Sequence, residues 1–175
     1  QLLIAAGADV NARSEDRYTP LLLAAMFGTA ETVQLLITAG ADVNTRGEKG
    51  YTPLHQSAQW GTAEKVQLLI AARANVNTRT ERGYTPLHLA AGWGTSESIQ
   101  LLIAAGADIA AKAEYGITVW ELAQKNHKLA GTEARWSLAE ALGKCSRWCD
   151  MLWWKQATAA DLQALLDAGA FTKLT

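Results

Sequence analysis

The stretch Leu35–Gln67, LLITAGADVNTRGEKGYTPLHQSAQWGTAEKVQ, carries the strongest structural signal in this chain, because close copies flank it on both sides. Leu2–Gln34 reads LLIAAGADVNARSEDRYTPLLLAAMFGTAETVQ, and Leu68–Gln100 reads LLIAARANVNTRTERGYTPLHLAAGWGTSESIQ. Each block has 33 residues, and each neighbouring pair is identical at 22 positions. Leu101 opens a fourth, weaker copy. A fixed period of this length predicts a stack of similar structural units.

Local signals predict two helices in each unit. Threonine is a good helix cap and proline fits the first helical turn, so each Thr-Pro pair predicts the start of a first helix that ends at the next glycine. The threonine after that glycine predicts the cap of a second helix, and a glycine such as Gly40 suits its left-handed end. Ala41 to Tyr51 remains as a connecting turn. One such unit cannot bury its apolar side alone, so the units must stack. The Thr-Pro pairs are Thr19-Pro20, Thr52-Pro53 and Thr85-Pro86.

The motifs of these units resemble the ankyrin repeat. The resemblance covers residues 1–124 and implies an all-α solenoid with short β-hairpin loops. About five units are expected: an N-terminal half unit, three regular units and one to two divergent C-terminal ones. It also implies that hairpin fingers and first helices form a concave face that binds other proteins. The motifs are Thr52-Pro53-Leu54-His55, Thr85-Pro86-Leu87-His88 and Gly40-Ala41-Asp42-Val43-Asn44.

Residues 125–175 are expected to be a divergent capping region of the same solenoid. Ala157 to Ala170, ATAADLQALLDAGA, aligns with the helix-forming part of a regular unit, and Asp150 to Gln156 would be the preceding helix. A separate small helical appendage is the alternative. The tail is rich in tryptophan, which we expect to fill or cover the open end of the stack, although a second contact surface or a small-ligand pocket remains open. These residues are Trp136, Trp148, Trp153 and Trp154.

Four rows of side chains recur at the repeat period, and the resemblance places them on the concave face. One interpretation is that Arg and Glu, two residues apart on a finger, pair with each other while the aromatic residues cover helix ends. The other is that they bind a protein partner, because Trp, Tyr and Arg dominate interface energetics. The candidate residues are Arg13, Glu15, Tyr18, Phe27, Arg46, Glu48, Tyr51, Gln59, Trp60, Arg79, Glu81, Tyr84, Trp93, Lys112 and Glu114.

Single positions receive structural interpretations. The histidines His55 and His88 are expected to bond neighbouring backbone, since Leu22 occupies the same place in another unit. Arg73 and Arg17 stand where other units have glycine, either through drift or, for Arg73, to contact an anion. Cys145 and Cys149 lack a second Cys or His pair at zinc spacing and are interpreted as free thiols.

Composition narrows the function class. Sixteen Lys and Arg against seventeen Asp and Glu give a net charge of −1, which argues against nucleic-acid or anionic-membrane binding by bulk charge. We expect no catalysis, cofactor or metal, because neither a Gly-rich phosphate loop nor a nucleophile motif is present. The sequence therefore predicts a monomeric protein-interaction scaffold in the cytoplasm. The alternative is that it is a fragment, the recognition arm of a larger enzyme or secreted effector, because the chain begins in mid-unit without methionine.

Overall fold

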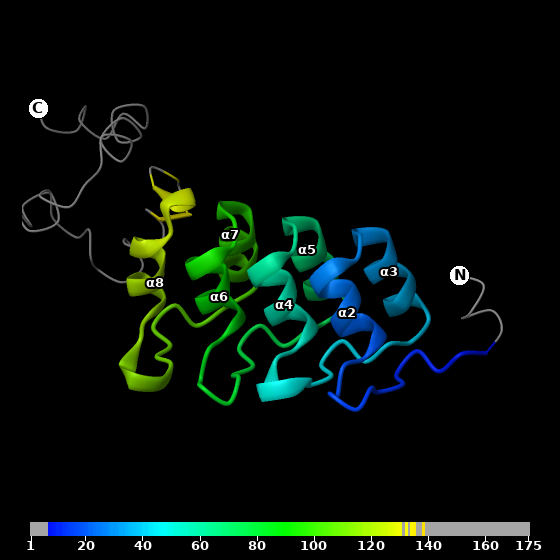
Figure 1. Ribbon diagram of the computed structural model, residues 1–175. Coiled ribbons are helices and arrows are strands. Elements are labelled where there is room, and N and C mark those ends of the chain that lie inside the picture. The colour runs from blue at the N-terminus through cyan, green and yellow to red at the C-terminus, as the bar shows by residue number, and fades with distance from the viewer. Residues whose placement is uncertain (1–6, 131, 133, 136–137, 139–175) are drawn as a thin grey trace, which may run out of the picture.

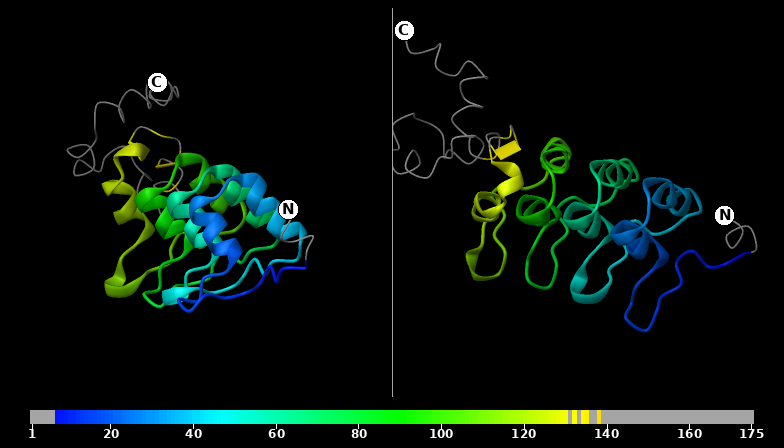
Figure 2. Two further views of the ribbon diagram at one scale, coloured as in Figure 1. Left: turned by 45° about the vertical axis from the view of Figure 1, so that its right-hand side comes forward. Right: turned by 45° about the horizontal axis from the view of Figure 1, so that its top comes forward.

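The computed structural model describes residues 7–130, 132, 134, 135 and 138 and shows a stack of helix pairs (Figure 1). One layer holds the inner helices α2 (Pro20–Phe27), α4 (Pro53–Trp60), α6 (Pro86–Trp93) and α8 (Val119–Lys125). The second layer holds the outer helices α3 (Ala30–Thr38), α5 (Ala63–Ala71) and α7 (Ser96–Ala104). The two further views in Figure 2 show the connecting loops projecting from one edge as parallel fingers. This arrangement confirms the all-α solenoid.

Helix boundaries follow the predicted caps. The Thr52 hydroxyl accepts a hydrogen bond from the His55 N–H, and Pro53 occupies the first turn of α4. At the other end, the Gly61 N–H donates to the Ser57 carbonyl. Capping satisfies backbone groups that have no partner within the helix, so these residues set where each short helix begins and ends. The same pattern recurs at Thr19, Thr85 and, without proline, Thr118.

The outer helices begin at a threonine cap and end in a left-handed residue. Gly40 and Gly106 have φ angles of +87° and +84° after α3 and α7. The next N–H, that of Ala41, donates to the Leu36 carbonyl at 2.9 Å, which closes the helix end. Arg73 adopts the same conformation after α5, with φ +65°. The tight turn is thus kept even where glycine is missing.

The core runs along the stack between the two helix layers. Each unit contributes a buried leucine from its inner helix and a branched residue from its outer helix, and Trp120 of α8 continues the same cluster. Because the buried residues of all units form one continuous cluster, the units stabilise one another. The repeated core residues are Leu21, Leu54, Leu87, Val33, Val66 and Ile99.

The fingers are hairpin-like loops, each closed at its base by a backbone hydrogen bond. The Gly47 N–H donates to the Tyr51 carbonyl at 2.8 Å, and the Thr80 N–H donates to the Tyr84 carbonyl at 2.9 Å. Short 3₁₀ turns, Glu48–Gly50 and Glu114–Gly116, lie at two finger tips, and a third, His127–Leu129, follows α8. Lys112 and Thr118 form the one β-bridge within the residues that the structure describes.

Several predictions for the tail lie outside the described residues. They concern the helix at Asp150 to Gln156, the four tail tryptophans, and the two cysteines.

Candidate functional site

The last residue of each of the first three inner helices is an exposed aromatic side chain. We call Phe27, Trp60 and Trp93 the aromatic row; they are 80%, 62% and 45% exposed. A glycine follows each one and ends the helix, which places the aromatic ring at the rim of its unit. Large apolar side chains aligned on an open surface are typical of binding sites.

The aromatic row ends at the fourth unit, where Asn126 stands in place of a tryptophan. Its side chain is buried, and its Nδ2 donates to the carbonyls of Ala91 at 3.1 Å and Gly94 at 3.4 Å. Asn126 therefore joins the fourth unit to the third and offers no exposed contact.

The tyrosines that precede the inner helices are only partly exposed and pack against the core. Tyr51 and Tyr84 are half-buried and pack against the core. Their rings lie 5.8 Å from the rings of His55 and His88, respectively, in edge-to-face geometry. Tyr18 is also half-buried, although its unit has Leu22 at the position of the histidine. Each ring thus presents only part of its surface to a partner.

The arginine row ties each finger to the next. Nη2 of Arg46 donates to the Arg79 carbonyl at 2.8 Å, and Nη2 of Arg79 donates to the Lys112 carbonyl. Arg13 donates to the Thr45 hydroxyl at 3.3 Å. These bonds fix the spacing between fingers while the arginines remain exposed to solvent.

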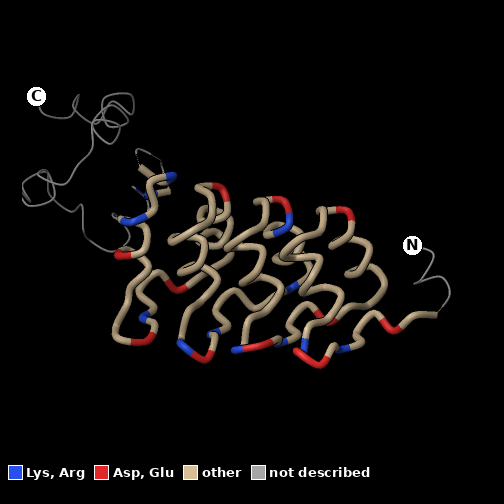
Figure 3. The backbone as a smooth tube through the Cα atoms, in the orientation of Figure 1, with Lys and Arg blue, Asp and Glu red and all other residues tan. Residues whose placement is uncertain are grey.

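The interpretation that arginine and glutamate of one finger pair with each other is wrong for the described residues. The two ion pairs among the described residues join Lys49 to Glu48 at 3.3 Å and Arg82 to Glu114 at 3.4 Å. The arginine side chains instead donate hydrogen bonds to the next finger, as described above. The row of exposed glutamates follows the finger edge, where acidic and basic residues alternate (Figure 3); these are Glu15, Glu48, Glu81 and Glu114.

The finger tips carry a further row that the sequence-based prediction missed. Lys49 and Arg82 lie one residue after the glutamate row and are exposed, with Tyr115 at the same place in the fourth unit. Their 33-residue period could have identified them. Lys49 and Arg82 line an open recess of about 350 Å³ between two fingers, together with Tyr51, Thr80 and Glu81.

The two histidines have structural surroundings, as predicted. Nε2 of His55 lies 3.0 Å from the Tyr84 carbonyl of the next unit, and Nδ1 accepts from the Thr52 N–H at 3.2 Å. Because a carbonyl only accepts, Nε2 carries the hydrogen, and because Nδ1 accepts from an N–H, the ring is neutral. Burial lowers the pKa of His55 to about 4 and also lowers the pKa of His88, whose Nε2 lies 3.3 Å from the Ile117 carbonyl.

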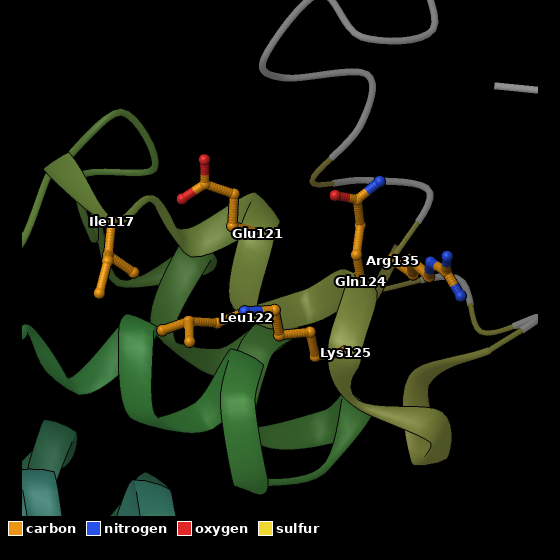
Figure 4. Close-up of a pocket in the computed structure, with 6 residues that line it drawn as sticks. All are labelled: Ile117, Glu121, Leu122, Gln124, Lys125 and Arg135. Carbon is orange, nitrogen blue, oxygen red and sulfur yellow. The ribbon is translucent and has the colours of Figure 1, made fainter. Parts of the chain in front are cut away.

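A second recess, of about 480 Å³, is bordered by residues of α8, by Ile117 before it and by Arg135 after it (Figure 4). Glu121 and Gln124 project from α8 on one side of it, and Ile117 and Leu122 supply apolar surface. The Glu121 carboxylate accepts a hydrogen bond from the Thr118 N–H at 3.0 Å, so it caps its own helix.

Metal-ligating groups and membrane-spanning helices can be assessed for the described residues alone. Among these residues, no three His, Cys, Asp or Glu side chains are grouped so as to hold a metal ion. Likewise, none of the described helices has both the length and the apolar character needed to cross a membrane.

Comparison with known proteins agrees with this geometry. A family model described as ankyrin repeats (3 copies) matches residues 1–80 and 45–113, which together span more than half of the chain. A search of curated proteins found no match.

Proposed function

The chain belongs to the ankyrin-repeat family, and on that premise we propose that it is a non-catalytic scaffold that binds a protein partner on its concave face. Ankyrin repeats are generally protein–protein interaction modules. The observation that carries the proposal is the aromatic row, in which three consecutive units each expose a large ring at the same position. Such rings supply most of the binding energy in many protein interfaces.

The spacing of the aromatic row favours an extended partner. Neighbouring inner helices pack side by side, at the roughly 10 Å usual for helix packing, so one ring is offered about every 10 Å along the stack. A small ligand would contact one ring only. A polypeptide segment that runs along the stack would contact all three.

The scaffold holds this face in place before a partner arrives. Arg46 and Arg79 join successive fingers, and the backbone N–H of Glu81 donates to the Lys49 carbonyl at 3.0 Å. A surface that is ordered in advance loses less conformational entropy on binding. We therefore assign the arginines a dual role: they position the fingers and present positive charge to the partner. Lys112, whose carbonyl accepts the bond from Arg79, adds a further positive charge.

The remaining candidates complete the proposed contact surface around the aromatic row. Gln59 lies next to Trp60 and is half-buried, and the tyrosines contribute the exposed part of their rings. The glutamates and the finger-tip residues Lys49 and Arg82 would form a charged rim that selects the partner by its charge pattern. We propose that the protein acts as a monomer, each copy binding one partner.

The test compares binding by two folded double variants. Peptides would be selected from a random library on the native protein, and their affinities measured for Trp60→Ala/Trp93→Ala and for Gln34→Ala/Gln67→Ala. The glutamines lie exposed on the outer helices α3 and α5, so the second variant controls for general surface change. We expect at least a tenfold affinity loss for the tryptophan variant alone. Equal affinity for both variants would refute binding on the aromatic row.

A further inference from the structure

The tips of two neighbouring fingers are hydrogen-bonded to each other. The fingers are numbered along the chain, so that residues 44–51 form the second finger and residues 77–84 form the third. The backbone N–H of Glu81, in the third finger, donates to the carbonyl of Lys49, in the second, at 3.0 Å. A Cβ added to Gly50 would lie 3.4 Å from the same Glu81 nitrogen, so the two backbones approach closely. The two tips therefore form one surface whose shape is set before a partner arrives.

An open recess of about 350 Å³ lies between these two tips, and each finger contributes a base to it. Lys49 comes from the second finger and Arg82 from the third, beside Tyr51, Thr80 and Glu81. The Lys49 and Arg82 side chains are 69% and 75% exposed. A group of a partner that enters the recess would therefore meet two accessible cations.

Positive charge is concentrated at these two fingers. Together they hold four basic residues against two acidic ones, whereas the first finger and the fourth each hold equal numbers of both. The first finger has Asp16 at the tip position, and the fourth has Tyr115. The second and third fingers thus carry the one pair of bases on adjacent tips of the described stack. The four bases are Arg46, Lys49, Arg79 and Arg82, and the two acids are Glu48 and Glu81.

The carboxylates beside Lys49 and Arg82 hold these bases only weakly. Nζ of Lys49 lies 3.3 Å from a Glu48 oxygen, and Nε of Arg82 lies 3.4 Å from a Glu114 oxygen. Both pairs stand largely in solvent, where an ion pair contributes little to stability. Replacing one of these pairs with a contact to a partner therefore destabilises the fold little.

The other two bases of these fingers keep their charge. Nη2 of Arg46 and Nη2 of Arg79 donate to backbone carbonyls of the following fingers. A carbonyl carries no net charge, so these hydrogen bonds hold the guanidinium groups in place without neutralising them. Both groups therefore add to the positive potential around the recess.

The outer helices carry the opposite charge. Each of them exposes a glutamate in its first turn, at the edge of the stack away from the finger tips (Figure 3). An acidic segment is therefore repelled from the outer helices and attracted to the second and third fingers. The three residues are Glu31, Glu64 and Glu97.

We propose that the recess between the second and third fingers receives the carboxylate of an acidic residue in the partner, which is therefore an acidic polypeptide segment. The proposal rests on the proposed function and names the chemistry of its partner. The Arg82 guanidinium can donate two parallel hydrogen bonds to one carboxylate, and Lys49 adds a point charge. A phosphate group carries nearly two charges and would be repelled more strongly by Glu81, which lines the same recess.

The test uses the peptides selected from the random library and a reversal of charge. Their affinities would be measured for Lys49→Glu/Arg82→Glu, called the finger variant, and for Arg73→Glu/Lys128→Glu. The second variant makes the same change of charge at exposed bases outside the fingers, and circular dichroism would verify that both are folded. We expect the selected peptides to carry Asp or Glu at a constant position. The finger variant should bind them at least about tenfold more weakly, and the control variant less than about twofold.

Substitutions in the peptide give a second readout. Replacing the acidic residue of the peptide with glutamine should weaken binding to the native protein, but not to the finger variant, which has already lost the contact. Replacing it with lysine should strengthen binding to the finger variant, since the charges are then complementary again.

Four results would overturn this inference while leaving the proposed function standing, provided that Trp60→Ala/Trp93→Ala still weakens binding. They are selected peptides without an acidic residue, equal losses in the finger and control variants, a glutamine substitution that weakens binding to the native protein and the finger variant alike, and a lysine substitution that strengthens binding to neither. Binding that neither the finger variant nor the tryptophan variant weakens would refute both proposals. A library that yields no binder would also count against both.

Discussion

The ammonium nitrogen of Lys65 lies 2.9 Å from the carbonyl oxygen of Ala25, across the junction between the first two units. It also lies 3.1 Å from the Gly28 carbonyl. Both carbonyls belong to the end of α2, where a helix has unpaired acceptors and partial negative charge. The side chain is buried, and that burial lowers the pKa of Lys65.

The group that covers these helix-end carbonyls differs from one junction between units to the next. Asn126 binds the matching carbonyls of Ala91 and Gly94 at the third junction. At the second junction the backbones approach closely instead, since a Cβ added to Gly94 would lie 2.4 Å from the Ala58 oxygen. A helix end inside the stack is thus covered either by a polar side chain from the next unit or by its backbone.

Replacing Lys65 with methionine should destabilise the protein by about 1–3 kcal/mol, because the apolar stem is kept while two buried carbonyls lose their donor. Urea unfolding monitored by circular dichroism measures this change. Lys125→Met is the control, since Lys125 is exposed. A similar loss in both variants would contradict the capping role of Lys65.

Asn77 joins two fingers, because its Nδ2 donates to the Gly106 carbonyl at 3.1 Å and its Oδ1 accepts from the Asp108 N–H at 2.8 Å. Asn77→Ala should cost about 1–2 kcal/mol by removing both hydrogen bonds. Hydrogen exchange localises the effect, because the Asp108 amide should lose protection while the Asn75 amide, held by Asn44, keeps it. Ala110 already stands at this position in the fourth unit, so the backbone accepts alanine there. An unchanged Asp108 exchange rate would argue against a stabilising role for these two hydrogen bonds.

Stability should fall when the pH drops from 7 to 4. Burial lowers the pKa of His55 to about 4 from 6.5, so in this window the unfolded chain binds a proton that the folded chain excludes. A shift of that size corresponds to about 3 kcal/mol of stability lost by pH 4. Denaturant unfolding across the window tests this expectation.

His55→Leu is the matched control for this pH dependence, because Leu22 occupies the same place in the first unit. The variant should lose part of the pH dependence, and His88, whose pKa burial also lowers, should account for a further part. If the variant and the native protein lose stability equally between pH 7 and 4, His55 is not the responsible group.

Trp60→Ala should change the free energy of unfolding by less than about 1 kcal/mol, since Trp60 is 62% exposed, and Trp93→Ala by somewhat more, since Trp93 is 45% exposed. Trp120→Ala should cost about 3–5 kcal/mol, because that ring is buried in the core. Thermal unfolding of the three variants makes the comparison. A cost for Trp60→Ala as large as that for Trp120→Ala would show that the aromatic row is part of the core.

Arg73→Gly should stabilise the protein by about 0.5–1 kcal/mol. Arg73 has φ +65°, a conformation that glycine adopts without the steric cost borne by other residues. The equivalent residues Gly40 and Gly106 show that glycine fits this turn. Urea unfolding would reveal the gain, and a loss of stability would mean that the arginine side chain makes a compensating contact.

Most of the fold was predictable because its signals are local. Thr85 and Pro86 predict the start of α6 at the residue where it begins, and Gly94 predicts its end. The contacts between fingers were not predictable in this way. Arg46 and Glu48 are close in sequence and suggested a pair, but Arg46 bonds the carbonyl of Arg79, which only stacking brings near.

The sequence by itself determined the repeat period, the helix boundaries and the rows of side chains, because capping and turn formation depend on neighbours a few residues away. The tertiary structure decided which members of each row are buried. Leu23, Gln56 and Leu89 share one position, yet of the three only Leu23 is exposed, since within the described residues only the other two have a preceding inner helix against them. Lys65 is buried for the same reason, although a lysine on an outer helix would be expected in solvent. Burial is a property of the assembled stack, and no single unit contains it.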